Sequence, residues 1–296
     1  MKNILIIGAN GFTGRRILND LSVNPIYHVT GCSLRDDICP GKDYRFVRTD
    51  IRDENEVRKL FKECRPDIVI NTSALSVPDY CETHHAEAEA TNVTAVETIA
   101  HVCEQYGSRF IHLSTDFVFD GKSTRLYKAE DEAIPVNYYG VTKLKAEKII
   151  ASICSNYAIV RVVVVYGKAL PGQHGNILQL VANRLRNGET IRVVSDQWRT
   201  PTFVGDISVG VEKLMFHTAN GIYHICGSEC LTIAEIAYRV ADFLKLDRSL
   251  IEPVTTEEMK EVTPRPRFSG LSIEKAKAEI GYTPRTLEEG MEASLF

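Results

Sequence analysis

The sequence has no strong excess of charge, no basic block and no long hydrophobic run. Its 296 residues carry a net charge of −4, so nucleic acid is not an expected partner. Apolar runs such as Val162 to Val165 are too short to cross a membrane, and the apolar N-terminal run is too short for a signal peptide. With 44% hydrophobic residues, the composition favours a globular cytoplasmic protein with a large core.

The eight cysteines form no C-x-x-C pairs, and several lie in apolar runs. This usage is typical of reduced, mostly buried thiols in a cytosolic protein. Cys81 is close to His84 and His85, but no second cluster of potential ligands accompanies them. Because zinc sites usually show paired ligand spacings, we predict no metal site.

Predicted strands alternate with predicted helices along the chain, which is the pattern of an α/β protein with a Rossmann-type doubly wound parallel sheet. In such sheets ligands bind beyond the carboxyl ends of the strands. Asp53 is predicted to cap one helix, and Thr232 with Glu235 forms a capping box for another. The predicted strands cover residues 2–7, 27–33, 44–49, 66–71, 108–113 and 157–165, and the main helices 15–21, 53–64, 85–106, 176–187 and 232–244.

A glycine-rich segment, G-x-x-G-x-x-G, follows the first predicted strand directly and opens a helix. Glycines in this context allow a tight turn and let backbone N–H groups approach a pyrophosphate at the helix N-terminus. A turn without a ligand is the alternative, but the position after an N-terminal strand favours dinucleotide binding. The predicted cofactor-binding residues of this turn are Gly8, Asn10, Gly11, Phe12, Thr13 and Gly14.

The end of the second strand bears on the choice between NAD(H) and NADP(H). NAD sites usually place Asp or Glu there to bind the ribose 2′-hydroxyl. Ser33 and Arg35 occupy this region and suit a 2′-phosphate better, because Arg makes charge-assisted, often bidentate bonds to phosphate. Asp36 and Asp37 follow at once, so a solvated turn is the alternative. The sequence therefore favours NADP(H), with NAD(H) as a second candidate, and Arg15 is expected to join the phosphate pocket.

Further cofactor contacts are expected where the other strands end, since those ends meet at one edge of the sheet. The expected residues are Asp50 and Ile51 after the third strand, Ser73 and Ala74 after the fourth, and Asn92 on the long helix.

Tyr139 and Lys143 form a Y-x-x-x-K pair on a predicted helix. Four residues are about one helical turn, so both side chains emerge on the same face. A cation beside a phenol favours the phenolate and lowers the tyrosine pKa toward the working range. Such pairs also occur on ordinary solvated helices, but Thr115, at the end of the fifth strand, is expected to face the same crevice.

Longer motifs carry a family resemblance. The glycine-rich turn together with Ser114 to Gly121 and Pro135 to Lys143 resembles an extended short-chain dehydrogenase/reductase. Asp196 to Thr202 and Arg265 to Ser269 narrow the resemblance to the dTDP-4-dehydrorhamnose reductase family, which reduces a 4-keto-6-deoxy sugar nucleotide with NAD(P)H. Gly31 to Arg35 resembles the related regulatory beta subunit of methionine adenosyltransferase, which binds NADP.

The reductase resemblance implies that Thr115, Tyr139 and Lys143 are catalytic. Tyr139 would protonate the developing alkoxide, Thr115 would bond the same oxygen, and Lys143 would lower the tyrosine pKa and hold the nicotinamide ribose. The family often has Gly where Arg199 stands, so this cation is expected to reshape the substrate pocket. The residues implied for binding the nucleotide-sugar partner are Asp116, Asn176, Gln197, Trp198, Arg199 and Arg265.

The resemblance also implies a division of the chain. A dinucleotide-binding domain is expected over residues 1–167, with a return segment at 203–226. Residues 168–202 and 227–296 would form a smaller C-terminal substrate lobe, and a homodimer is a possible assembly.

Three alternatives share this frame. Dehydratases of the superfamily typically have Glu after Thr-Asp, whereas Phe117 follows Asp116 here, so elimination lacks its expected base. An epimerase would keep NAD bound and not consume it. A non-catalytic NADP-binding regulatory subunit is the third alternative, against which the intact Thr115, Tyr139 and Lys143 argue.

Overall fold

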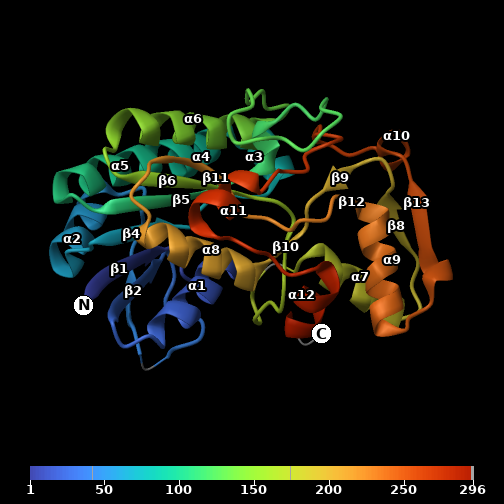
Figure 1. Cartoon of the computed structure of the whole chain (residues 1–296), viewed down its shortest axis with the longest axis horizontal. Coiled ribbons are helices and arrows are strands. Elements are labelled where there is room, and N and C mark those ends of the chain that lie inside the picture. The colour runs from blue at the N-terminus through green and yellow to red at the C-terminus, as the bar shows by residue number, and fades with distance from the viewer. Residues whose placement is uncertain (42, 174, 295–296) are drawn as a thin grey trace.

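A seven-stranded parallel sheet forms the centre of the larger part of the molecule, as the computed structural model shows for residues 1–41, 43–173 and 175–294 (Figure 1). The last two residues of the predicted lobe, 295–296, lie outside this description. The strand order is β11-β6-β5-β4-β1-β2-β3, and the Rossmann-type prediction is confirmed. The strands are β1 (Lys2–Ile7), β2 (Tyr27–Ser33), β3 (Arg45–Arg48), β4 (Ile68–Asn71), β5 (Arg109–Thr115), β6 (Tyr157–Val162) and β11 (Gly221–His224).

Helices cover both faces of the sheet, and the central strands β4 and β5 are buried along their whole length. On β1, Ile4 and Ile6 pack with α1 (Phe12–Ser22) and α8 (Val204–Phe216). Leu5 and Ile7 point the opposite way, toward the other three sheet helices. These are α2 (Glu54–Cys64), α5 (Ala95–Tyr106) and α6 (Tyr138–Ile153).

Two predicted elements are interrupted. The helix predicted over 85–106 consists of α4 (His85–Glu89), a π-helical turn η1 (Ala90–Thr94) and α5. The strand predicted over 157–165 ends at Val162, since Val164 adopts a left-handed backbone with φ 38° before the short strand β7 (Val165–Tyr166). Both predicted caps are confirmed: the Asp53 carboxylate accepts bonds at the start of α2, and Thr232 and Glu235 form a capping box.

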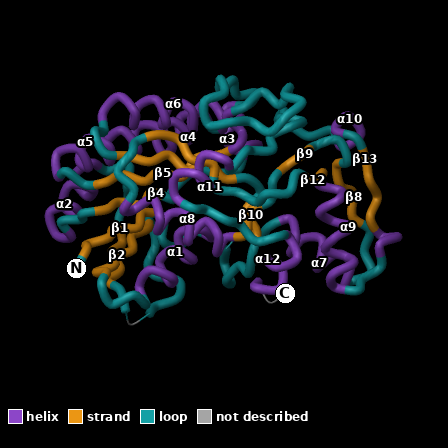
Figure 2. The backbone as a smooth tube through the Cα atoms, in the orientation of Figure 1, coloured by secondary structure: helices purple, strands orange, loops and turns teal. Residues whose placement is uncertain are grey.

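A smaller lobe with its own apolar core packs at the carboxyl-end side of the sheet, at the right of Figures 1 and 2. The lobe contains α7 (Ile177–Arg186), α9 (Ile233–Leu244) and the parallel pair of β8 (Ile191–Val194) and β13 (Ile251–Val254). Between its two main segments the chain returns to the sheet through α8 and β11. The shorter elements are α3 (Pro78–Thr83), η2 (Asp116–Val118), β9 (Trp198–Arg199), β10 (Thr202–Phe203), β12 (Leu231–Thr232), η3 (Arg248–Leu250), α10 (Thr256–Met259), α11 (Glu274–Ile280) and α12 (Leu287–Ser294).

No helix within the described parts of the chain combines the length and the apolar character that a membrane span requires.

Candidate active site

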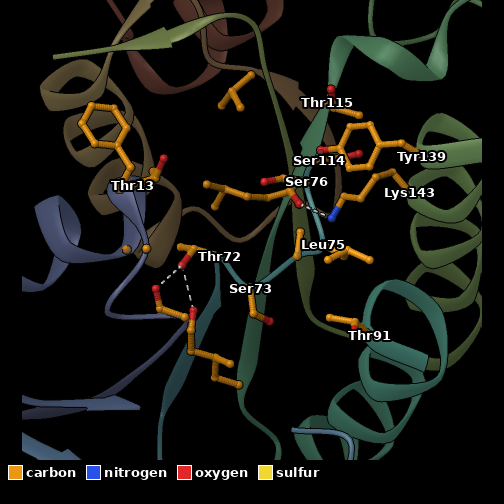
Figure 3. Close-up of a pocket in the computed structure, with 18 of the residues that line it drawn as sticks. Thr13, Thr72, Ser73, Leu75, Ser76, Thr91, Ser114, Thr115, Tyr139 and Lys143 are labelled. Atoms are coloured by element: carbon orange, nitrogen blue, oxygen red, sulfur yellow. Dashed lines mark hydrogen bonds between the residues drawn. The ribbon is translucent and has the colours of Figure 1, made fainter. Parts of the chain in front are cut away.

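A cavity of about 830 Å³, called the crevice below, lies at the carboxyl ends of β1, β2, β4 and β5 and is bounded by α6 (Figure 3). This size is typical of sites for cofactors and small substrates. It brings together many of the residues that the sequence singled out. The predicted residues that line it are Gly8, Gly11, Phe12, Thr13, Gly14, Ser33, Asp50, Ile51, Ser73, Ala74, Thr115, Asp116, Tyr139, Lys143 and Arg265.

The glycine-rich turn lies at one end of the crevice and leaves no room for a Cβ atom at Gly8 or Gly14. Gly8 has φ 81°, and a Cβ there would lie 2.7 Å from the Ser73 backbone nitrogen. A Cβ on Gly14 would collide with the Gly8 carbonyl and lie 2.5 Å from Thr72 Oγ1. Helix α1 begins directly after Gly11, so its first N–H groups open toward this space. A bare backbone cradle at a helix N-terminus fits a pyrophosphate.

Thr72 is a crevice residue that the sequence reading missed. Its hydroxyl donates to the carbonyl oxygens of Ile7 (2.8 Å) and Gly8 (3.2 Å), which ties the end of β4 to the glycine turn (Figure 3). Its position next to Ser73 after a predicted strand could have identified it. Arg52 was missed as well, and it lines the crevice with its guanidinium paired to Asp50 at 2.6 Å.

The residues after β2 only partly match the predicted phosphate pocket. Ser33 lines the crevice, whereas Arg35 is exposed and falls outside the lining residues described for it. Asn10 is also outside that lining, because its amide donates to the carbonyl oxygens of Arg35 (3.2 Å) and Asp36 (2.9 Å). Asn10 therefore fastens this loop to the glycine turn.

Arg15 does not join the phosphate pocket, contrary to expectation. Its guanidinium is buried in an ion pair with Asp37 and also bonds the Tyr44 hydroxyl at 2.8 Å and the Asn10 side chain. The Asp37 carboxylate, 22 positions along the chain, thus pairs with the guanidinium that was expected to bind a phosphate.

Asn92 lies behind the crevice wall and does not line it. It is fully buried in the π-helical turn η1, where its Oδ1 accepts a bond from the Leu75 N–H (2.8 Å). Its Nδ2 donates to the Leu75 carbonyl (3.0 Å) and to Thr142 Oγ1 (3.1 Å). Asn92 therefore fixes the loop after β4 against α6. We take this as its contribution to the site.

Thr115, Tyr139 and Lys143 converge at the other end of the crevice (Figure 3). Asn137 is the N-cap of α6, and its side-chain oxygen accepts a bond from Gly140 N at 2.9 Å, which sets the positions of Tyr139 and Lys143 on the helix. Thr115 ends β5, and its hydroxyl, which donates to Asp116 Oδ1 at 3.2 Å, lies beside the Tyr139 side chain. Lys143 Nζ donates to the Leu113 carbonyl at 2.7 Å and lies 2.9 Å from His112 Nε2.

The pKa of Tyr139 is raised in this structure, contrary to the predicted lowering. Burial raises the pKa of Tyr139 well above its usual range, and the neighbouring Thr115 hydroxyl offsets only part of that effect. Burial also lowers the pKa of Lys143 to about 8. Desolvation is the largest cause for both groups: Lys143 is buried, with its nitrogen bonded to the Leu113 carbonyl, and Tyr139 is partly buried in the crevice wall.

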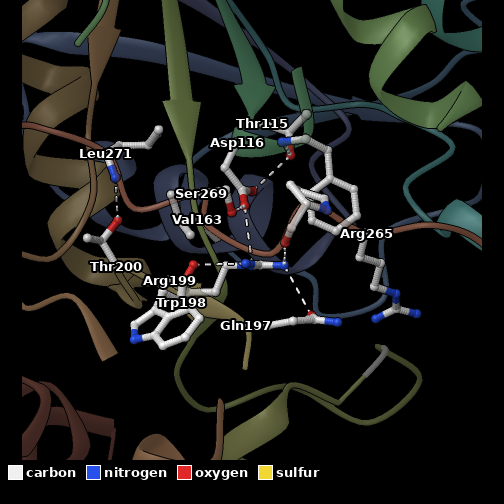
Figure 4. A network of polar contacts seen from close by, with 12 residues as sticks. Thr115, Asp116, Val163, Gln197, Trp198, Arg199, Thr200, Arg265, Ser269 and Leu271 are labelled. Atoms are coloured by element: carbon white, nitrogen blue, oxygen red, sulfur yellow. Dashed lines mark hydrogen bonds and ion pairs between the residues drawn. The ribbon is translucent and has the colours of Figure 1, made fainter. Parts of the chain in front are cut away.

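Asp116 and Arg199 form a buried network beside Thr115 (Figure 4). The Arg199 Nε lies 3.6 Å from Asp116 Oδ2, and its guanidinium donates to the carbonyl oxygens of Pro266 (2.7 Å) and Trp198 (2.8 Å). The carboxylate also accepts bonds from Ser269 and from Thr115 Oγ1 (3.2 Å). Burial raises the pKa of Asp116, and Arg199 opposes that rise.

Arg199 was predicted to reshape a substrate pocket, but its side chain is turned into the protein. Its charge is paired with Asp116 and its N–H groups donate to carbonyl oxygens, so it supports the protein wall behind Thr115. Arg199 is not among the described residues that line the crevice. Gln197 is buried beside it and donates to Glu261 at 2.7 Å. The Trp198 ring is 39% exposed and points away from Asp116 (Figure 4).

The other two predicted substrate residues differ in location. Asn176 caps α7, donates to the Gly167 carbonyl at 2.8 Å and lines a second cavity of about 690 Å³ beside that helix. Arg265 lines the crevice itself, with Asp79 at 3.7 Å and Glu261 at 3.3 Å. Of the lobe's predicted contacts, Arg265 is thus the cation best placed to meet an anionic ligand.

Within the described residues, no group of three His, Cys, Asp or Glu side chains could hold a metal ion. The residues considered for such a site face other partners. Cys81 is buried with its thiol toward the Leu75 carbonyl, while the rings of His84 and His85 stack on tyrosines.

Comparison with known proteins identifies relatives over the whole chain. The sequence matches the family described as "RmlD substrate binding domain" over residues 1–295. It is 30% identical over 291 residues to the probable low-salt glycan biosynthesis reductase Agl14 of Haloferax volcanii, covering 97% of this chain and 95% of that protein. It is 31% identical to methionine adenosyltransferase 2 subunit beta of Xenopus laevis, covering 96% and 84%.

A solved structure agrees with these relatives. The dTDP-4-dehydrorhamnose reductase of Bacillus anthracis in complex with NADP superimposes with a TM-score of 0.87 at 26% identity, covering 100% of this chain and 99% of that one.

Proposed function

The chain belongs to the RmlD substrate-binding domain family, and from this membership and the crevice we propose that it reduces the 4-keto group of a nucleotide-activated 6-deoxy sugar with NAD(P)H. The observation that carries the proposal is the crevice. One cavity holds the glycine-rich backbone turn, which fits a pyrophosphate, at one end and Thr115, Tyr139 and Lys143 at the other. Reductases of glycan biosynthesis among the relatives support the same reaction class.

The chain's own residues would hold the ketone and deliver a proton. When bound, the nicotinamide cofactor would supply the hydride. Tyr139 is protonated at neutral pH, because burial raises its pKa, so its hydroxyl can donate to the alkoxide that develops at the ketone oxygen. The Thr115 hydroxyl, which donates to Asp116 Oδ1 at 3.2 Å in this structure, would turn to donate to the same oxygen and fix its position. Lys143 lies one turn along α6 and would bind the cofactor ribose.

The lobe would bind the nucleotide part of the substrate. Arg265 reaches the crevice from the lobe side, and a guanidinium matches diphosphate oxygens bidentately. We propose NADP(H) as the preferred cofactor, because no acidic residue ends β2 and Ser33 faces the crevice. The expected cytoplasmic location and homodimer stay predictions.

Replacing Tyr139 with Phe tests the proposal. We expect turnover of a dTDP-4-keto-6-deoxy sugar, followed as loss of NADPH absorbance, to fall by about 10²–10⁴-fold while NADPH affinity is retained, since only the proton donor is removed. Tyr138→Phe is the matched control. The Tyr138 hydroxyl bonds Glu89 at 3.2 Å and its ring stacks on His85, away from the crevice. Near-normal turnover by the Tyr139 variant would contradict the assignment.

A non-catalytic NADP-binding subunit is the second candidate, because the methionine adenosyltransferase subunit is as similar in sequence as the reductase. Tight binding of NADP without turnover of any nucleotide ketose would favour this reading. Stoichiometric consumption of NADPH would favour the reductase and also exclude an epimerase, which consumes no cofactor.

A further inference from the structure

A buried line of polar groups runs behind Lys143, and the proposed reaction makes no use of it. His112, on β5, is fully buried with 0% exposure. Its Nε2 lies 2.9 Å from Lys143 Nζ, and its Nδ1 lies 3.2 Å from Asn71 Nδ2 at the end of β4. Asn71 is fully buried as well. Such groups must satisfy one another, so their donors and acceptors can be assigned.

The orientation of Asn71 follows from its other contacts. Its Oδ1 accepts bonds from the Ser73 backbone N–H at 3.0 Å and from the Ser73 hydroxyl at 2.6 Å. A backbone N–H can only donate, so the oxygen of the amide must face Ser73 and the NH₂ must face His112. His112 Nδ1 therefore accepts, and the single hydrogen of a neutral imidazole is on Nε2.

This tautomer restricts the lysine. The Nε2–H of His112 points at Lys143 Nζ, and an ammonium has no lone pair with which to accept it. A neutral amine can accept this bond and still donate to the Leu113 carbonyl at 2.7 Å. The contacts of Lys143 Nζ are thus those of an amine.

We infer that His112 is a positioning residue that Asn71 holds in the Nε2–H tautomer, so that it donates to Lys143 and favours the amine form of the lysine. The inference goes beyond the proposed function and rests on it only where turnover is concerned. It assigns to His112 control over the pH at which Lys143 loses its charge.

The surrounding charges agree with this assignment. Burial and the nearby lysine hold the pKa of His112 well below its usual range, which keeps the imidazole neutral. Burial lowers the pKa of Lys143 to about 8, and Glu147, one turn along α6, opposes that shift. Glu147 is itself paired with Arg161 on β6 at 2.6 Å. Tyr139, also on α6, is uncharged at neutral pH.

The consequence for reduction is a falling rate at alkaline pH. Donation of the Tyr139 proton leaves a phenolate, which a charged Lys143 stabilises and a neutral one does not. A group with a lowered pKa loses its proton at a lower pH, so turnover should fall as the pH rises through the lysine pKa near 8.

Asn71→Asp is the decisive variant. A carboxylate keeps the acceptor for Ser73 but presents an acceptor to His112, which moves the imidazole hydrogen to Nδ1 and lets Nε2 accept from an ammonium. The alkaline limb of turnover against pH should move up by about one pH unit, which is a tenfold change in proton affinity. The double variant Asn71→Asp with His112→Leu separates the effect of the imidazole tautomer from the effect of the added negative charge. Compared with His112→Leu alone, the double variant should show no further upward shift, and a further shift of about one pH unit there would overturn the inference.

A measurement without turnover completes the test. In the ¹⁵N-histidine NMR spectrum of the native chain, the His112 signals are those lost in His112→Leu. We expect them to show the Nε2–H tautomer, while the Nδ1–H tautomer would overturn the inference whatever the activity. If the Nε2–H tautomer is found but no nucleotide ketose is reduced, the proposed function fails and the histidine assignment stands.

Discussion

Arg199→Met would remove the cation of the buried network beside Thr115. The side chains of Arg199 and Asp116 are 2% and 5% exposed, with 3.6 Å between Nε and Oδ2. Met has a similar length but no charge, so Asp116 would keep Ser269 and Thr115 as partners and lose its counter-ion. The carbonyl oxygen of Pro266 would lose its donor as well.

Leaving one member of a buried ion pair without its partner costs about 3–5 kcal/mol. The free energy of unfolding of a typical protein is about 5–15 kcal/mol, so this cost is a large part of the total stability. At about 2–4 °C per kcal/mol for larger domains, the melting temperature should fall by roughly 10 °C.

The loss should depend on pH in a stated direction. Burial already raises the pKa of Asp116, and Arg199 limits that rise. Without Arg199 the folded-state pKa rises further above the unfolded value of about 4. A group whose folded pKa is raised contributes stability that is present at low pH and lost as pH rises through that pKa. The variant should therefore lose less stability at pH 4 than at pH 7.

Arg267→Met is the matched control for these melting experiments. Arg267 is 53% exposed and pairs with Glu257 and Asp196 at the surface, so the same substitution should cost no more than about 1 kcal/mol. Equal losses for the two variants would refute the reasoning. A loss in Arg199→Met that does not shrink at low pH would show that Asp116 is not its origin.

Two predictions concern the cofactor end of the crevice. Gly14→Ala should abolish detectable NADPH binding in a fluorescence titration, because its Cβ would collide with the Gly8 carbonyl. Gly175→Ala, whose Cβ would lie 3.6 Å from Gln179, should bind normally, and equal binding by both would contradict the cradle. Ser33→Asp should lower kcat/KM for NADPH roughly 10- to 100-fold, the loss of about 1.5–3 kcal/mol of charge-assisted bonding, with NADH affected less. If the ratio of kcat/KM for NADPH to kcat/KM for NADH is the same in the Ser33→Asp variant as in the native chain, the 2′-phosphate is bound elsewhere.

The elements that could be predicted are those with local causes. The strand Tyr27–Ser33 has the predicted bounds, and the caps at Asp53 and Thr232 depend on residues within one helical turn. The glycine turn likewise depends on a local conformation, because Gly8 has a positive φ that glycine adopts easily. The π-helical turn at Ala90–Thr94 was not predictable, since its apolar spacing resembles that of the flanking helix.

The errors concern side chains whose partners lie far along the chain. Arg15 and Arg199 were expected to bind ligands because each lies near a sequence motif. Their actual partners, Asp37 and Asp116, cannot be identified from the sequence around each arginine. The pKa of Tyr139 was expected to fall, because spacing places a cation nearby but does not report burial. Tertiary enclosure, which decided all three, is not a local property of sequence.

The return of the chain to the sheet sets an order of events during synthesis. Strand β11 pairs with β6 through residues 221–224, and Asn220 accepts a bond from Tyr157 N at 2.8 Å. Until the ribosome has delivered these residues, β6 presents an unpaired edge to other nascent chains. The whole first segment of the smaller lobe must therefore be synthesised before that edge closes. The connection that joins the two parts of the molecule thus delays completion of the sheet until residue 224, while α9 and β13 of the lobe are made later still.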